Sequence, residues 1–139
     1  MHAYILEHDN ESERLEKQNS LKNYCVSEEL KNIEITSQMS VLDAGCGTGA
    51  ITRHILNHST PHKMTAIDFS ETRLAQAKKL TALECNTSDI IFKRVDMLNE
   101  KLEEDQFDLI ISRFVMHHLT NPQVAVTMLA KALKPNGRL

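Results

Sequence analysis

Asp43 stands just ahead of a glycine cluster, and the two together are the strongest sign of chemistry in the sequence. The chain has four glycines, and three of them are Gly45, Gly47 and Gly49. Glycines this close together indicate a backbone that turns sharply and closely approaches another group. The apolar residues before Asp43 predict a buried strand, and residues 50–56 predict a helix. A strand, a glycine turn and a helix are typical of the nucleotide-binding half of an α/β fold.

Three more charged residues, Asp68, Asp96 and Arg113, each stand at or just after the end of a predicted strand. Strands that alternate with helices imply right-handed crossovers and a parallel sheet. Ligands of such sheets bind outside the carboxyl ends of the strands. We therefore expect these three residues and Asp43 to line one crevice.

The elements that must position these residues follow from periodicity and from turn residues. Strands are predicted at 39–44, 64–67, 90–95 and 107–111. Helices are predicted from 50 to about 58, from the N-cap Ser70 to about 84, and after Pro122 to Leu133. Residues 134–137 end the last helix, and Arg138 with Leu139 predicts the entry to a fifth strand that is missing.

Length and composition allow one domain with a real core. The chain has 139 residues and a net charge of −3, so a basic face for nucleic acid is not expected. No apolar run is long enough to span a membrane. The three cysteines have no paired spacing, which favours free thiols and a cytoplasmic protein. We expect a helical arm over residues 1–36 and a cofactor-binding domain over 37–139.

The glycine motif alone fits two cofactor classes. Gly45, Gly47 and Ala50 match the dinucleotide pattern G-x-G-x-x-A, and Asp68 lies where an acid can bind ribose hydroxyls. Asp43, however, would lie close to a dinucleotide's pyrophosphate and repel it, whereas it would attract an ammonium group. S-adenosylmethionine carries an ammonium and a sulfonium and has no phosphate, so a pocket with three acidic residues suits it better. An NAD(P)-dependent oxidoreductase remains the alternative.

The sequence resembles the class I S-adenosylmethionine-dependent methyltransferases over about residues 37–139. The motifs that carry the resemblance are Val41–Gly49, Ala66–Ser70, Val95–Met97, Phe107–Phe114 and Leu133–Leu139. The resemblance implies a Rossmann-like three-layer α/β/α fold whose mostly parallel sheet has the strand order 3-2-1-4. It also implies S-adenosylmethionine as the cofactor and S-adenosylhomocysteine as the product.

The resemblance also implies roles for individual residues. Asp43 would act on the cofactor's ammonium, Asp68 on both ribose hydroxyls, and Asp96 on the adenine amine, while Arg113 would close the methionine end. Phe69 would lie near the adenine, and Met97 would pack on it. The implied cofactor-binding residues are Asp43, Ala44, Gly45, Cys46, Gly47, Gly49, Asp68, Phe69, Asp96, Met97 and Arg113, with Tyr4, Arg14 and Gln18 at the cofactor carboxylate.

His117 and His118 follow the fourth predicted strand, near where a methyl acceptor would enter. Either could be a general base that takes a proton from the attacking atom. Neighbouring histidines do not share a helix face, and no acid or cysteine stands at ligand spacing, so no metal site is expected.

The sequence does not identify the residues that would bind the methyl acceptor. By resemblance, the sheet would continue past Leu139, so we expect a truncated chain whose fourth strand is an exposed edge. Such an edge could pair with a second copy of the chain. The expected acceptor is a small molecule, and a non-catalytic binding module is the second alternative.

Overall fold

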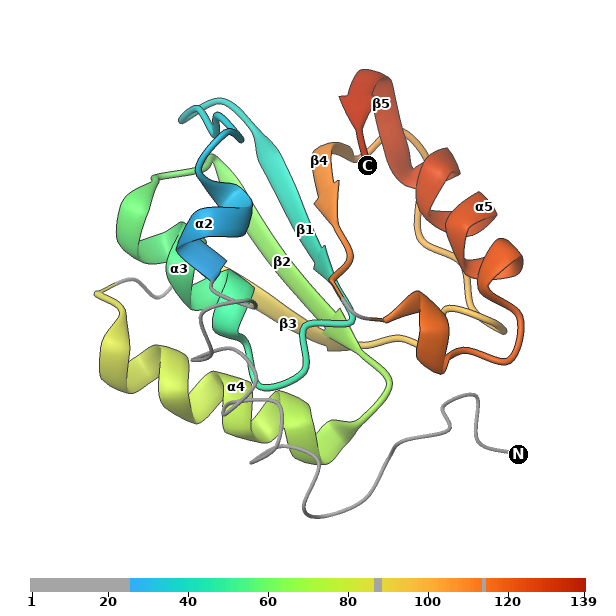
Figure 1. The fold of residues 1–139 in the computed structure, drawn as a ribbon, viewed down its shortest axis with the longest axis horizontal. Coiled ribbons are helices and arrows are strands. Elements are labelled where there is room, and N and C mark those ends of the chain that lie inside the picture. The colour runs from blue at the N-terminus through green and yellow to red at the C-terminus, as the bar shows by residue number, and fades with distance from the viewer. Residues whose placement is uncertain (1–25, 87–88, 114) are drawn as a thin grey trace.

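The computed structural model describes residues 26–139 apart from 87, 88 and 114. Its centre is a sheet of five parallel strands in the order β3-β2-β1-β4-β5 (Figure 1). The strands are β1 (Ser40–Ala44), β2 (Lys63–Asp68), β3 (Ile90–Arg94), β4 (Phe107–Ile111) and β5 (Leu133–Arg138). The predicted parallel sheet and the predicted order of its first four strands are confirmed.

Helices cover both faces of the sheet (Figure 1). They are α2 (Val26–Leu30), α3 (Ala50–His58), α4 (Glu71–Glu84), α5 (Pro122–Ala132) and the short 3-10 helix η2 (Met116–His118). The predicted N-cap is present, because the Ser70 side chain accepts a 3.3 Å hydrogen bond from the backbone N–H of Arg73.

Alternation along the strands produces two separate cores. Leu42 of β1 and Ile110 of β4 pack with α5, whereas their neighbours Val41 and Leu109 pack with α2 and α3. Successive side chains of a strand point to opposite faces, so strands buried on both faces read as continuous apolar runs. Two covered faces give the three-layer α/β/α arrangement. Helix α2 belongs to the core that contains Val41 and Leu109, because its buried Val26 and Leu30 pack there.

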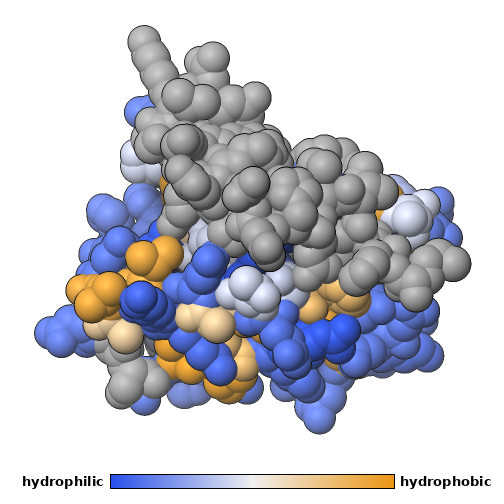
Figure 2. Space-filling model, turned by 90° about the horizontal axis from the view of Figure 1, so that it is seen from below, coloured by the Kyte–Doolittle hydropathy of each residue, from blue (hydrophilic) through white to orange (hydrophobic). Residues whose placement is uncertain are grey.

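The register brings the carboxyl ends of the central strands together. Asp43 lies opposite Ala66 of β2 and opposite Ile111 of β4. In Figure 1 the arrowheads of β1 and β2 point to the lower side, and Figure 2 shows the molecule from that side. In the coloured part of that surface most residues are hydrophilic, and small groups of hydrophobic residues lie among them. The sequence predicts a ligand at this end of the sheet.

The end of α5 differs from the prediction. The helix ends at Ala132, and Leu133 begins β5 beside Phe107 of β4 rather than continuing the helix. Pro135 disfavours helical backbone at Lys134, the residue before it, so the helix could not continue through this segment. β5 then bulges around Asn136, whose φ is 69°, before Arg138 pairs with Leu109.

The presence of β5 corrects two further expectations. The sheet does not stop at β4, and β4 is not an exposed edge, because β5 runs along it. A dimer formed through the edge of β4 would therefore have to displace β5. In the part of the chain that the structure describes, no helix is both long enough and apolar enough to cross a lipid bilayer.

Candidate cofactor site

The loop between β1 and α3, residues 45–49, has a backbone that only glycine adopts easily. Gly45, Gly47 and Gly49 have φ values of 76°, 55° and 89°, all in the left-handed region. A Cβ atom on Gly45 would lie 2.3 Å from Cγ2 of Val115, so this position also lacks space for a side chain. The clustered glycines are therefore explained by both conformation and packing.

Hydrogen bonds fasten this loop to the end of β2. The backbone N–H groups of Gly45 and Cys46 both donate to the carbonyl of Ile67, each at 2.8 Å. The N–H of Gly47 donates to Oδ2 of Asp68 at 2.9 Å, and the N–H of Ser70 donates to Oδ1 at 2.9 Å. Asp68 is 4% exposed. Its carboxylate thus joins the glycine loop to the start of α4.

Asp43 lies beneath the loop and is 1% exposed. Its Oδ2 accepts a 2.7 Å hydrogen bond from the hydroxyl of Thr52, in the first turn of α3. Burial raises the pKa of Asp43 to about 7, and the nearby charge of Asp68 adds to the rise. The Thr52 hydroxyl and the charge of Arg113 act in the opposite direction. A carboxyl group with a pKa so close to neutral is typical of functional sites.

Arg53 holds the other side of the loop. It is only 8% exposed, and its guanidinium donates to the carbonyl of Thr48. Its Nε lies 2.8 Å from Oε2 of Glu84, in the last turn of α4. One arginine therefore links the glycine loop to a second helix.

Arg113, at the carboxyl end of β4, reaches back to α2. It forms an ion pair with Glu29, in which Nη2 lies 3.2 Å from Oε1. Its charge also lowers the pKa of Asp43. That Arg113 and Asp43 line one crevice stays a prediction.

Asp96 lies after β3 and stabilises its own loop. Its Oδ1 accepts from the backbone N–H of Leu98 at 3.0 Å, and its Oδ2 accepts from Nδ2 of Asn99 at 2.7 Å. Phe69 follows Asp68, and the guanidinium of Arg94 lies 4.9 Å from the centre of its ring. Asp96 and Phe69 therefore both lie beyond the carboxyl ends of their strands, β3 and β2.

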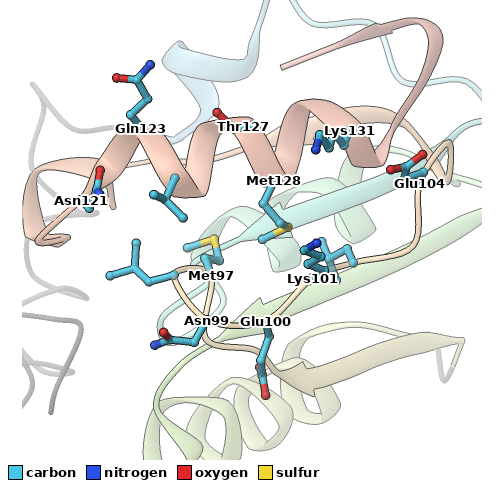
Figure 3. Close-up of a pocket in the computed structure, with 13 residues that line it drawn as sticks. Met97, Asn99, Glu100, Lys101, Glu104, Asn121, Gln123, Thr127, Met128 and Lys131 are labelled. Carbon is cyan, nitrogen blue, oxygen red and sulfur yellow. The ribbon is translucent and has the colours of Figure 1, made fainter.

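Met97 is buried in the core of the domain. Its side chain is 1% exposed and packs in the core beneath α5, facing Met128 (Figure 3). A contact between Met97 and the adenine stays a prediction.

His117 and His118 belong to η2. This turn follows Val115, whose side chain abuts Gly45, so η2 starts beside the glycine loop. A role for either histidine stays a prediction. Tyr4, Arg14 and Gln18 lie outside the described residues.

Cys46 lies inside the loop but is buried, and burial raises the pKa of its thiol well above the usual range. It is therefore not an activated nucleophile. Among the described residues, no three His, Cys, Asp or Glu side chains are grouped as a metal site.

Four residues that contribute to the site were not predicted: Thr52, Arg53, Glu29 and Val115. Thr52 carries the one signal that could have been read, a polar residue beside Ile51 and Ile55 on the buried side of α3. The other three contacts depend on tertiary packing.

A parallel sheet with helices on both faces and a left-handed glycine loop at its carboxyl end defines a Rossmann-like domain. The family comparison agrees: the model of the methyltransferase domain family matches residues 42–139, and the chain belongs to that family.

Two curated relatives and one solved structure illustrate the similarity. The chain is 34% identical over 100 residues to the malonyl-[acyl-carrier protein] O-methyltransferase of Halalkalibacterium halodurans, covering 72% of this chain and 37% of the relative. It is 30% identical over 117 residues to the demethylmenaquinone methyltransferase of Leptospira interrogans, covering 84% of this chain and 46% of the relative. The chain thus spans less than half the length of these relatives.

The solved structure is a SAM-dependent methyltransferase from Aquifex aeolicus. It superposes with a TM-score of 0.74 at 22% identity, over 93% of this chain and 69% of that one. At 22% identity this structural similarity supports the fold alone.

Proposed function

We propose that this chain binds S-adenosylmethionine at the carboxyl ends of β1, β2 and β3 and takes part in methyl transfer to a small molecule. The observation that carries the proposal is the linked unit of Asp43, the glycine loop and Asp68. Two carboxylates that are almost fully buried meet one left-handed loop there. This arrangement favours a cofactor with cationic and hydroxyl groups over one with phosphates.

The glycine loop supplies the surface for the methionine part of the cofactor, because its left-handed glycines allow a close approach of the backbone. Asp43 is the partner for the ammonium group. A cation beside Asp43 favours its ionised form, so it offsets the burial that raises the pKa of Asp43.

Asp68 is the partner for the ribose hydroxyls. Gly47 and Ser70 each donate to one of its two carboxylate oxygens, and a carboxylate oxygen can accept more than one hydrogen bond. The ribose hydroxyls would donate to the same carboxylate. Asp96 is the proposed acceptor for the adenine amine, and its carboxylate also stabilises its own loop. Phe69 supplies an apolar face for the ring.

The bound cofactor supplies an electrophilic methyl group on a sulfonium that is already a good leaving group. The residues of this chain therefore have mainly to orient the cofactor and exclude water. His117 and His118, on the turn that starts beside Gly45, are the candidates for holding a proton from the acceptor.

The relatives support a small acceptor. Their names specify methyl transfer to malonyl-[acyl-carrier protein] and to demethylmenaquinone. One name denotes an acyl group on a carrier protein and the other a quinone, and neither denotes a nucleic acid. The net charge of −3 agrees with this preference.

Calorimetric titration with S-adenosylmethionine, S-adenosylhomocysteine and NAD tests the proposal. We expect saturable binding of the first two and none of NAD. Asp68→Asn keeps the shape of the side chain and should weaken binding by about tenfold or more. The matched control is Glu71→Gln, which removes the same charge from the exposed first turn of α4. NAD binding, or equal affinities of the two variants, would refute the proposed site, provided that circular dichroism shows both variants folded.

A further inference from the structure

A cavity lies between the segment that follows β3 and the helix α5, beside Met97 (Figure 3). Its volume is about 490 Å³, within the range of roughly 300–1,000 Å³ in which small-molecule sites fall. One wall is the segment 97–104 and the other is α5 from Asn121 to Lys131. The glycine loop, Asp43 and Asp68 do not line it.

The floor of this cavity is apolar and adaptable. Met97 and Met128 point toward each other between the two walls (Figure 3). Leu98, Leu102 and Val124 add branched side chains to the same lining. Methionine is unbranched and polarizable, so a pair of methionines can adjust to an aliphatic chain.

The rim carries two lysines on opposite walls, Lys101 and Lys131 (Figure 3). Neither has an ion-pair partner among the residues that the structure describes. Two glutamates also line the cavity: Glu100 points away from α5 in Figure 3, whereas Glu104 lies at the same end of the cavity as Lys131. The rim near Lys131 thus carries two ammonium groups and one carboxylate, that of Glu104.

We propose that this cavity binds a small amphipathic anion, with an aliphatic tail against Met97 and Met128 and a carboxylate head between Lys101 and Lys131. An apolar floor buries the tail, and two cations from separate walls hold one anionic head by charge-assisted hydrogen bonds. The site is separate from the glycine loop, and the inference does not depend on the proposed function.

Sodium decanoate is the probe, titrated below its micelle concentration into the chain labelled with ¹³C at the methionine methyl groups. We expect saturable shifts of the Met97 and Met128 signals and none of Met64, which is buried on the opposite face. Acetate, which lacks the tail, and decanol, which lacks the charge, should bind much more weakly. Decanol binding as tightly as decanoate would overturn the anionic head, and absence of saturable shifts would overturn the site.

Variants separate the rim from general charge effects. Lys131→Gln and Lys101→Gln should each weaken decanoate binding by about tenfold, whereas Lys79→Gln, an exposed lysine on α4, should not. Thr127→Trp, at an exposed position of the lining, should block the cavity without disturbing the core. Equal effects of the three lysine variants, or displacement of decanoate by S-adenosylhomocysteine, would contradict a separate anion site.

Discussion

The hydroxyl of Thr52 donates a 2.7 Å hydrogen bond to the carboxylate of Asp43 in the interior of the domain. Thr52 is fully buried and Asp43 is 1% exposed, so neither group has water as an alternative partner. The bond connects the end of β1 to the first turn of α3, across the glycine loop. It fixes the carboxylate that we expect to face the cofactor's ammonium.

Removing the Thr52 hydroxyl should leave that carboxylate without its donor. Thr52→Val keeps the shape of the side chain, and we expect it to lower the free energy of unfolding by about 1–3 kcal/mol near pH 8, where Asp43 is ionised. Thr52→Ser retains the hydroxyl and is the matched control. Urea denaturation measures both, and equal stabilities of the two variants would show that the hydrogen bond contributes little.

The pKa of Asp43 predicts how stability depends on pH. In the folded chain it is about 7, against an ordinary value of 3.8. Between these values the folded state keeps a proton that the unfolded state has released, so this group makes stability fall as pH rises from about 4 to 7. Over this pH range, the free energy of unfolding should fall by at most ~4 kcal/mol because of Asp43. Asp43→Asn should flatten the curve in that window, as thermal unfolding at several pH values can test. An unchanged slope would contradict a raised pKa.

Gly45 should tolerate no side chain. Gly45→Ala forces alanine into the left-handed region and drives its Cβ into Val115, so we expect a loss of about 2–5 kcal/mol. Adding Val115→Ala to this variant should restore the stability that is lost through the clash. The stability that is lost because alanine has a left-handed φ should not be restored. A double-mutant cycle by urea denaturation isolates this coupling, and strictly additive effects would refute the contact.

Arg53 is expected to act on the cofactor through the loop that it holds. Arg53→Met removes the donor to the Thr48 carbonyl, and we expect about tenfold weaker binding of S-adenosylhomocysteine. Glu84→Gln removes only the partner of Arg53 on α4 and should have a smaller effect. An Arg53→Met variant that is folded and binds with unchanged affinity would rule out this positioning role.

The sequence was informative where local chemistry decides the structure. Three glycines within five residues, and aspartates at the ends of apolar runs, predicted the loop and the ends of the strands because both signals are local. The direction of Met97 was not predictable, since the packing of α5 sets it. β5 was missed because Leu133 fits the helical period of α5, and only Pro135 and the pairing with Phe107 turn it into a strand.

The Arg53 and Arg113 contacts illustrate a second limit. Each arginine pairs with a glutamate on a helix that is distant in sequence, Glu84 and Glu29 respectively. Charged residues that are interspersed along a chain do not indicate their partners. Only the docking of α2 and α4 on the sheet selects these pairs.

Binding of S-adenosylmethionine at the glycine loop is tested most directly by the backbone amide shifts that it causes when added to the ¹⁵N-labelled chain. We expect saturable shifts at the amides of Gly45, Cys46, Gly47 and Gly49, together with those that follow Asp68 and Asp96. NAD should leave the same amides unchanged. Shifts confined to other parts of the chain, or a response to NAD at the glycine loop, would contradict the assignment of this loop to S-adenosylmethionine.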